Sequence, residues 1–283
     1  MRKKDLQTFP FQVTVSVPGF IAGLGEVILA QETSDSVTIS GFISDYNNNA
    51  INNCSVMFMN SNFDVLFETK SNNNGIYQIR IPKGKYKSMG AINMDTYPHT
   101  MKAGTNNEDL RLEFWGWNFI ADKDTILNIK YDRMEAYGLH AFQIPGGMPT
   151  YQIYVRPMSL TRYLTNKDIK SQQHKQDLSN IIQTVSSKSA TCDNLAPTID
   201  KVNIKVWIDG EKVPILMKQQ IKEYYEENEF GIAYYLTVDH PQHKKSSPYH
   251  IFKVELKDME NGDQGEAIYF LEETNYIERT NNM

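Results

Sequence analysis

The sequence predicts an all-β protein with two β-sandwich domains, and three observations lead to this prediction. Short runs of alternating apolar and polar residues recur along most of the chain, and a period of two is typical of strands that bury one face. Clusters rich in Asn, Gly and Pro separate these runs, as tight turns require. With 283 residues, of which 40% are hydrophobic, the chain is long enough for two packed domains.

Residues 1–30 have the outline of a cleaved secretory signal peptide. Met1-Arg2-Lys3-Lys4 is a charged segment, and the mostly apolar run Phe9–Ala30 follows it before polar Gln31. Pro and Gly residues interrupt the run, so an irregular N-terminal arm is the alternative. We therefore expect a secreted, periplasmic or cell-surface protein. No other stretch approaches the ~20 apolar residues of a membrane-spanning helix.

The clearest strand pattern lies between Val37 and Tyr97. In Val37–Ser44, the residues Val37, Ile39, Gly41 and Ile43 fall on one face, and Ile76–Pro82 also alternates with a period of two. Asn74-Gly75 precedes the second of these runs. We interpret it as a tight turn, because Gly and Asn tolerate the backbone conformations that such turns require. We expect Tyr77 to be buried on the strand that follows this turn.

The motifs in this stretch resemble those of the carboxypeptidase regulatory-like domain, a small transthyretin-like β-sandwich. They are Gly41-x-Ile43-x-Asp45, the turn before Ala50-Ile51, Cys54-x-Val56, Thr69…Asn74-Gly75-x-Tyr77 and Ile81-Pro82-x-Gly84-x-Tyr86. The resemblance implies a non-catalytic accessory module of the kind found on secreted or surface proteins. Each motif is a turn-and-strand signature, so the resemblance implies a fold and no chemistry.

Two further alternating runs, Leu110–Ile120 and Thr125–Tyr131, are expected to complete this first sandwich, which we place at residues 36–135. Residues 136–165 add a β-hairpin around Gly146-Gly147. The sequence leaves two positions open for this hairpin, since it either extends the first sandwich or bridges to the second.

A helix and a linker are predicted for residues 166–197. Apolar residues recur there with helical spacing at Leu178, Ile181, Ile182 and Val185. Pro197 then biases the chain towards extended geometry.

The alternating pattern resumes in residues 198–280 and predicts the second sandwich. Asp209-Gly210 is a hairpin turn, and three strands are expected at Gly231–Val238, Tyr249–Leu256 and Ala267–Leu271. Ile215–Asn228 fits either a helix or a pair of short strands. In strand count and spacing the region resembles an immunoglobulin- or fibronectin-like sandwich.

Composition excludes several classes of function. The net charge is −5 and no long basic patch occurs, which argues against nucleic-acid binding. Two cysteines, Cys54 and Cys192, do not make a disulfide framework. No Ser nucleophile elbow, phosphate-cradling Gly loop or metalloprotease helix occurs. The sequence therefore predicts a protein with neither catalytic activity nor a cofactor.

Two polar clusters suggest metal sites but are better explained as surface structure. His240, His243 and His250 have ligand-type side chains, yet Pro241 and the lysines after His243 favour a solvated loop. Asp258–Glu266 is similar to a calcium-binding loop, but Gly262 is fifth rather than sixth. We therefore expect a hairpin turn there and no metal.

Trp115 and Trp117 are the candidate ligand-binding residues, together with Glu113. They lie two apart on a predicted strand, so all three project to the same side. Exposed, the two indoles would form a flat platform for sugar rings; buried, they would be core. Arg156, Glu135 and Asp132 are also charged and lie near aromatic residues, but no sequence pattern joins them into an acid–base pair.

The predicted function is a non-catalytic, exported accessory protein of structural or adhesion type at the cell surface or in the periplasm. Its expected partner is a surface protein or a glycan. The first alternative is a carbohydrate-binding module that uses Trp115 and Trp117. An enzyme with its site in residues 110–160 is the second.

Overall fold

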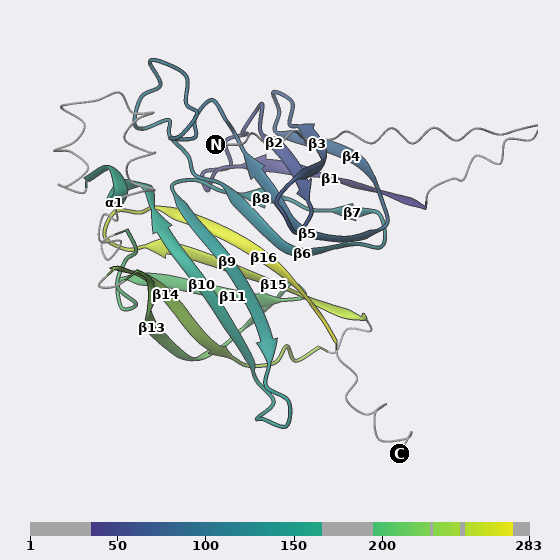
Figure 1. Cartoon of the computed structure of the whole chain (residues 1–283), viewed down its shortest axis with the longest axis vertical. Coiled ribbons are helices and arrows are strands. Elements are labelled where there is room, and N and C mark those ends of the chain that lie inside the picture. The colour runs from purple at the N-terminus through teal and green to yellow at the C-terminus, as the bar shows by residue number, and fades with distance from the viewer. Residues whose placement is uncertain (1–34, 166–194, 227–228, 244–246, 274–283) are drawn as a thin grey trace, which may run out of the picture. The chain divides into compact units, whose positions relative to one another are not determined.

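The computed structural model describes residues 35–165, 195–226, 229–243 and 247–273, and the regular secondary structure of these residues is almost entirely β-strand (Figure 1). The strands are β1 Ser36–Ser44, β2 Ser55–Met59, β3 Val65–Lys70, β4 Ile76–Pro82, β5 Gly84–Ile92, β6 Phe114–Ala121, β7 Thr125–Ile126, β8 Ile129–Lys130, β9 Met134–Gln143, β10 Tyr151–Ser159, β11 Val202–Ile208, β12 Glu211–Val213, β13 Ile215–Glu226, β14 Glu229–Val238, β15 Tyr249–Asp258 and β16 Gln264–Glu272. The helix in this part of the chain is α1, Leu160–Thr165. The all-β fold class is therefore confirmed.

Three sheets organise these strands. An eight-stranded sheet has the order β12-β11-β15-β16-β6-β5-β2-β3, and we call it the shared sheet. A smaller sheet has the order β4-β1-β7, with β8 also paired to β1, and another has the order β13-β14-β10-β9. The parallel pairing of β16 with β6 joins the four strands β11, β12, β15 and β16 of the C-terminal part of the chain to β2, β3, β5 and β6 of the N-terminal part.

The first hydrophobic core contains residues of the β1 sheet and of the shared sheet, including Ile39, Phe58 and Phe119. Tyr77 on β4 is only 1% exposed, and its hydroxyl donates to the carbonyl oxygen of Leu127 at 2.8 Å. The predicted burial of Tyr77 is confirmed. Gly41 on β1 is required by close approach, because a Cβ there would overlap the Leu127 carbonyl group.

The second hydrophobic core contains residues of the β14-β10-β9 strands and of the shared sheet. Along β16, Ala267 and Tyr269 belong to this second core, whereas Ile268 and Phe270 belong to the first. Because side chains alternate across a strand, the shared sheet is buried on both faces at β16. The molecule thus contains two sandwiches that have one sheet in common.

The structure settles what the sequence left open about two segments. The hairpin of residues 136–165 is formed by β9 and β10, and β10 pairs with β14, so it joins the second core. The segment Ile215–Asn228 was predicted as a helix or two short strands; both are wrong, because β13 is one twelve-residue strand. Its pairing with β14 explains this, since a tertiary partner overrides a helical apolar spacing.

Other expectations need smaller corrections. The strand predicted at Leu110–Ile120 begins only at Phe114, and Leu110 instead packs against Leu160 in a small third cluster. The run Thr125–Tyr131 forms two separate two-residue strands. The hairpin turns predicted at Asp209-Gly210 and at Asn261-Gly262 are confirmed.

Several predicted features lie outside the described residues. These are the signal peptide of residues 1–30, most of the helix and linker of residues 166–197, and Cys192. In the described part of the chain nothing supports a helical linker.

Cys54 is a buried free thiol that accepts a hydrogen bond from the Tyr131 hydroxyl. No helix among the described residues is long and apolar enough to cross a membrane. The division into domains at residues 135 and 198 stays a prediction.

Candidate functional site

The two predicted tryptophans form a stacked pair at the meeting of β6 and the second core. Their ring centroids lie 5.1 Å apart with an interplanar angle of 17°. Trp117 is 8% exposed and Trp115 is half-buried beside it. Phe63 approaches both indoles edge-on at 6.3 and 6.2 Å, and Tyr137 does so at 5.7 and 5.4 Å. The indoles therefore stack on each other within an aromatic cluster.

The backbone of β6 is irregular at Asn118, and as a result the tryptophans and Phe119 pack into different cores. By simple alternation Trp115, Trp117 and Phe119 would share a face. Trp117 belongs to the second core, however, and Phe119 belongs to the first. Asn118 lies between them with a φ of +50°, a left-handed conformation that Asn tolerates better than most residues. The strand thus switches faces at Asn118.

Glu113 and Glu135 form a buried carboxyl pair next to Trp115. The Trp115 indole Nε1 donates to Glu135 Oε1 at 2.9 Å, and the Tyr97 hydroxyl donates to Glu113 Oε1 at 3.4 Å. Burial raises the pKa of Glu113 to about 7. Burial, followed by the negative charge of Glu113, raises the pKa of Glu135 well above its ordinary value. The two carboxyl groups share a hydrogen bond, which requires that one of them keep its proton.

A pocket of about 260 Å³ adjoins Glu135. Its walls are mostly apolar and come from β9, β10, β14 and the residues just before β11; they include Tyr137, Met158 and Ile232. Arg156 also lines it, with its guanidinium 5.5 Å from the Tyr137 ring centroid. Arg156 Nε donates to Glu223 Oε2 at 2.7 Å, so its charge is balanced from β13.

The residues flagged by sequence are therefore only partly brought together. Glu113, Trp115, Trp117 and Glu135 are neighbours, and Arg156 lines the same pocket as Glu135. Asp132 is elsewhere, in an ion pair with Arg111 at 2.7 Å. Glu113 does not line the pocket, so the two carboxyl groups do not face a common ligand space. Ligand binding by Trp115, Trp117 and Glu113 stays a prediction.

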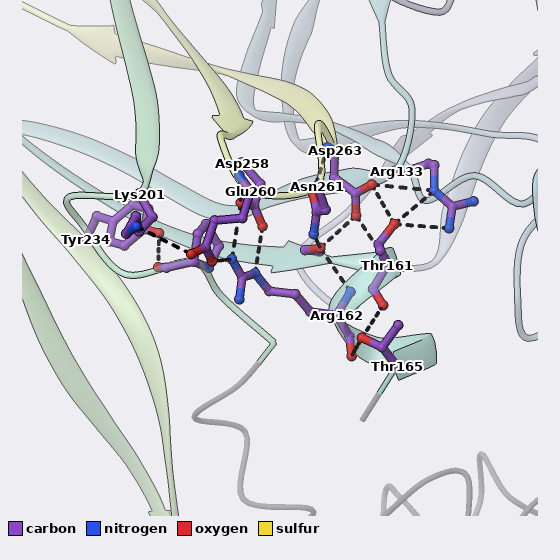
Figure 2. A network of polar contacts seen from close by, with 12 residues as sticks. Arg133, Thr161, Arg162, Thr165, Lys201, Tyr234, Asp258, Glu260, Asn261 and Asp263 are labelled. Carbon is purple, nitrogen blue, oxygen red and sulfur yellow. Dashed lines mark hydrogen bonds and ion pairs between the residues drawn. The ribbon is translucent and has the colours of Figure 1, made fainter. Parts of the chain in front are cut away.

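A second acidic cluster joins the turn after β15 to helix α1 (Figure 2). Asp263 is 3% exposed and accepts hydrogen bonds from the Ser159 hydroxyl at 2.6 Å, the Thr161 hydroxyl at 2.7 Å and the Thr161 amide at 2.8 Å. Arg133 Nε lies 3.4 Å from the same carboxylate. These contacts fix the start of α1 to the β15–β16 turn.

Arg162 neutralises the other buried carboxylate of this turn. Asp258 is fully buried and receives Arg162 Nε at 2.6 Å and a second guanidinium nitrogen at 3.1 Å, a bidentate contact. Arg162 also reaches Glu260 at 2.6 Å (Figure 2). The segment that is similar to a calcium loop is thus a hairpin turn whose acidic groups are held by arginines and hydroxyls. Sequence signalled the turn through Asn261-Gly262 but gave no sign of its partners on α1.

The predicted histidine cluster is divided. His240 and His250 line one pocket of about 650 Å³, with the Tyr151 ring 4.7 and 5.7 Å from them. His243 instead contacts Glu211 at 2.8 Å. His250 Nδ1 lies 2.6 Å from Asp209, and that hydrogen bond raises the pKa of His250. In the described ranges, no three His, Cys, Asp or Glu side chains are arranged to hold a metal ion.

Comparison with known proteins gives structural likenesses alone. No protein-family model matches the chain, and no curated protein matches it. A DUF3823 family protein from Parabacteroides merdae aligns over 84% of this chain and 100% of its own, at 7% identity and a TM-score of 0.25. The major pilin subunit of Bacillus cereus aligns over 84% and 69%, at 10% identity and 0.23. The mouse nectin-like molecule 4 ectodomain aligns over 84% and 64%, at 10% and 0.23. Likenesses this weak carry no argument about function.

Proposed function

We propose that this chain is a non-catalytic accessory protein of structural or adhesion type, exported to the cell surface or periplasm. The observation that supports this most is the use of its buried acidic groups. Asp258 and Asp263 are bound by arginines and hydroxyls, and Glu135 is bound by Trp115 and Glu113. Each of these groups holds elements of the fold together.

The geometry of the Glu113–Glu135 pair favours a structural role over an acid–base role. A catalytic acid and base must both reach the reacting atoms. Of the two, Glu135 lines the adjoining pocket and Glu113 does not; Glu113 accepts a hydrogen bond from the Tyr97 hydroxyl. A shared proton within the core stabilises the pair but leaves neither group free to exchange protons with a substrate.

Within this function, residues 36–135 act as a carboxypeptidase regulatory-like module. The turn glycine of the motif, Gly75, has a φ of +73°, and Tyr77 is in the core, as the family's turn-and-strand motifs demand. Such a module contributes a stable surface instead of a reactive site.

Export is the part of this proposal that can be tested most simply. The full chain is produced in a bacterial host with a C-terminal epitope, and the cells are fractionated and shaved with protease. We expect protease-accessible or periplasmic protein whose intact mass corresponds to a start near Gln31. A Leu29→Arg variant, which interrupts the apolar run, serves as the matched control and should stay in the cytoplasm. Wild-type protein that keeps Met1 and remains cytoplasmic would contradict the proposal.

A further inference from the structure

We propose that the turn between β9 and β10 of one copy of this chain inserts into the pocket beside Glu135 of a second copy. We call the turn, residues 144–149, the hairpin tip, and the pocket the Glu135 pocket. Both belong to the β9–β10 hairpin, because Tyr137 of β9 and Met158 of β10 line the pocket at the end opposite the tip. In Figure 1 the hairpin tip lies at the end of the hairpin away from α1.

The hairpin tip is exposed and apolar. Every residue from 144 to 149 is exposed, and the exposed fractions of the two large apolar side chains are 49% for Ile144 and 77% for Met148. No Asp, Glu, Lys or Arg occurs between His140 and Arg156. Apolar side chains gathered on an uncharged surface mark sites of interaction with a protein or a membrane.

The backbone holds the hairpin tip in one conformation. The Gly147 amide donates to the Ile144 carbonyl oxygen at 3.0 Å, and Pro145 and Gly146 occupy the two central positions between them. Gly146 has a φ of +70°, so this is a type II turn with Pro and Gly in their preferred places. A preformed turn loses little conformational freedom on binding, so a few contacts suffice.

The Glu135 pocket has the size that the hairpin tip requires. Its volume of about 260 Å³ exceeds the ~150 Å³ of an engineered apolar cavity that holds benzene. The side chains of Ile144 and Met148 together have only slightly more heavy atoms than benzene. The walls of the pocket are mostly apolar, as such side chains need.

The polar groups of the pocket are already engaged, so an uncharged occupant matches it. Glu135 accepts a hydrogen bond from Trp115 and shares another with Glu113 inside the fold. Arg156 donates to Glu223, which balances its charge. An acidic or basic segment would bring a charge into the pocket without a new partner, whereas the hairpin tip brings none.

A copy cannot fill its own pocket. At about 3.3 Å per residue, the strand from Tyr137 to Ile144 spans roughly 20 Å. The β9–β10 ladder runs from Met134 to Gln143, so the hairpin cannot fold back on itself. A contact between the tip of one copy and the pocket of the next uses two different surfaces. Each copy therefore keeps one of them free for a further neighbour, and the assembly grows head to tail.

A membrane surface suits the hairpin tip less well. A single myristoyl chain gives only marginal membrane binding, and the two side chains of the tip offer fewer methylene groups than that chain. The net charge of −5 adds no attraction to anionic lipids.

The test is sedimentation velocity of the purified chain over about a hundredfold range of concentration. We expect the weight-average sedimentation coefficient of wild type to rise with concentration. Met148→Asp puts a charge on the tip and should weaken association at least tenfold. Ile126→Asp is the matched control, because it puts the same charge on an exposed Ile of β7 and should change nothing. Thermal denaturation verifies that both variants fold.

A pocket variant shows which surfaces meet. Ala196→Leu fills the pocket from its wall and should also weaken association about tenfold. Met148→Asp keeps its pocket and Ala196→Leu keeps its tip, so an equimolar mixture should form dimers that grow no further. If Ala196→Leu does not fold, methyl NMR of wild type decides, since signals of Met148 and Met158 should both shift with concentration.

Four results would overturn the inference. They are a wild-type chain that stays monomeric, association that Met148→Asp does not weaken, association that a folded Ala196→Leu retains, and a concentration-dependent shift of Met148 without Met158. The third would show that tips pair with each other. A monomeric chain that binds phosphatidylcholine vesicles through Met148 would instead identify a lipid partner. None of these results bears on export, so the proposed function is tested independently.

Discussion

Two pairs of buried carboxyl groups in this protein are neutralised in opposite ways. Asp258, the last residue of β15, contacts the guanidinium group of Arg162, and Asp263, just before β16, contacts that of Arg133. Glu113 and Glu135, beside the tryptophan stack, have no ion pair in the described ranges and share a hydrogen bond instead. The same side-chain chemistry therefore gives a pair held by cations in one place and a pair held by a proton in the other.

The difference teaches how each pair responds to change. A buried carboxylate that loses its arginine is left as an uncompensated charge, which is costly at neutral pH. A pair that shares a proton is stable only while the proton stays, so its stability depends on pH. The first pair should be sensitive to mutation of its cations, and the second to alkaline conditions.

The largest expected effect is the removal of Arg162. Arg162→Met leaves Asp258 fully buried without its bidentate partner and should lower the free energy of unfolding by about 3–5 kcal/mol. Urea denaturation measures the change. Lys201→Met is the matched control, because Lys201 pairs with Glu260 at the surface and should matter by at most about 1 kcal/mol. Equal losses for the two variants would contradict the contrast between buried and exposed pairs.

The tryptophan stack next to the Glu pair provides the second test. Trp117→Ala opens a cavity in the second core and should reduce stability by about 3–5 kcal/mol. The carbohydrate-binding alternative predicts something else: sugar-dependent quenching of tryptophan fluorescence, which Trp117→Ala would abolish without unfolding the protein. Thermal denaturation and fluorescence titration with a neutral polysaccharide distinguish the two. A fully stable Trp117→Ala variant would show that the ring is not core.

The pH dependence of stability comes next in size. Burial raises the pKa of Glu113 from 4.5 to about 7 in the folded protein, so its contribution is complete below pH 4.5 and is lost as pH rises through 7. The loss between about pH 5 and about pH 8 should be about 3 kcal/mol. Glu113→Gln, which mimics the neutral carboxyl group, should remove this loss.

The comparison of Glu113→Gln with wild type is necessary because the titration of His250 also changes the stability of the fold in this pH range. Its pKa is raised by Asp209, so it too stabilises the fold at low pH and loses that effect as pH rises. The difference between the two proteins isolates the glutamate pair. Identical pH profiles for wild type and Glu113→Gln would exclude the raised pKa of Glu113.

The smallest expected effect is at Trp115. Trp115→Phe keeps an aromatic ring in the stack but removes the Nε1 donor to Glu135, at a cost of about 1–2 kcal/mol. Chemical denaturation at about pH 6 measures it. A Trp115→Phe variant with wild-type stability would indicate that the indole hydrogen bond contributes nothing to the pair.

Much of the fold was predictable from the sequence, because strands that bury one face alternate visibly. The strands at Val37–Ser44 and Ile76–Pro82 and the burial of Tyr77 follow from that period alone. The pairing of β6 with β16 was not predictable, since a parallel contact between distant segments leaves no local signal. The sequence therefore predicts two sandwiches but not the sheet that they share.

The candidate site was predictable only in its parts. The spacing of Trp115 and Trp117 predicts that they share a face of the strand. The switch of faces at Asn118 could not be predicted, because a left-handed backbone conformation changes the direction of the side chains that follow but leaves the alternating sequence pattern intact. Glu135 was noted as charged, yet its contact with Glu113 depends on β9 and β6 packing in three dimensions. Arg162 and Asp258 lie 96 positions apart, so no local pattern could join them.

The most direct measurement is carbon-13 NMR of the glutamate side-chain carboxyl groups as a function of pH, with Glu113→Gln and Glu135→Gln used for assignment. We predict that the Glu135 signal keeps the shift of a protonated carboxyl group well above pH 5, and that Glu113 titrates near 7. That result would show a pair held by a proton inside the fold. Two signals that titrate together near the ordinary value of 4.5 would show two solvated carboxylates, and would contradict the structural role assigned to this pair.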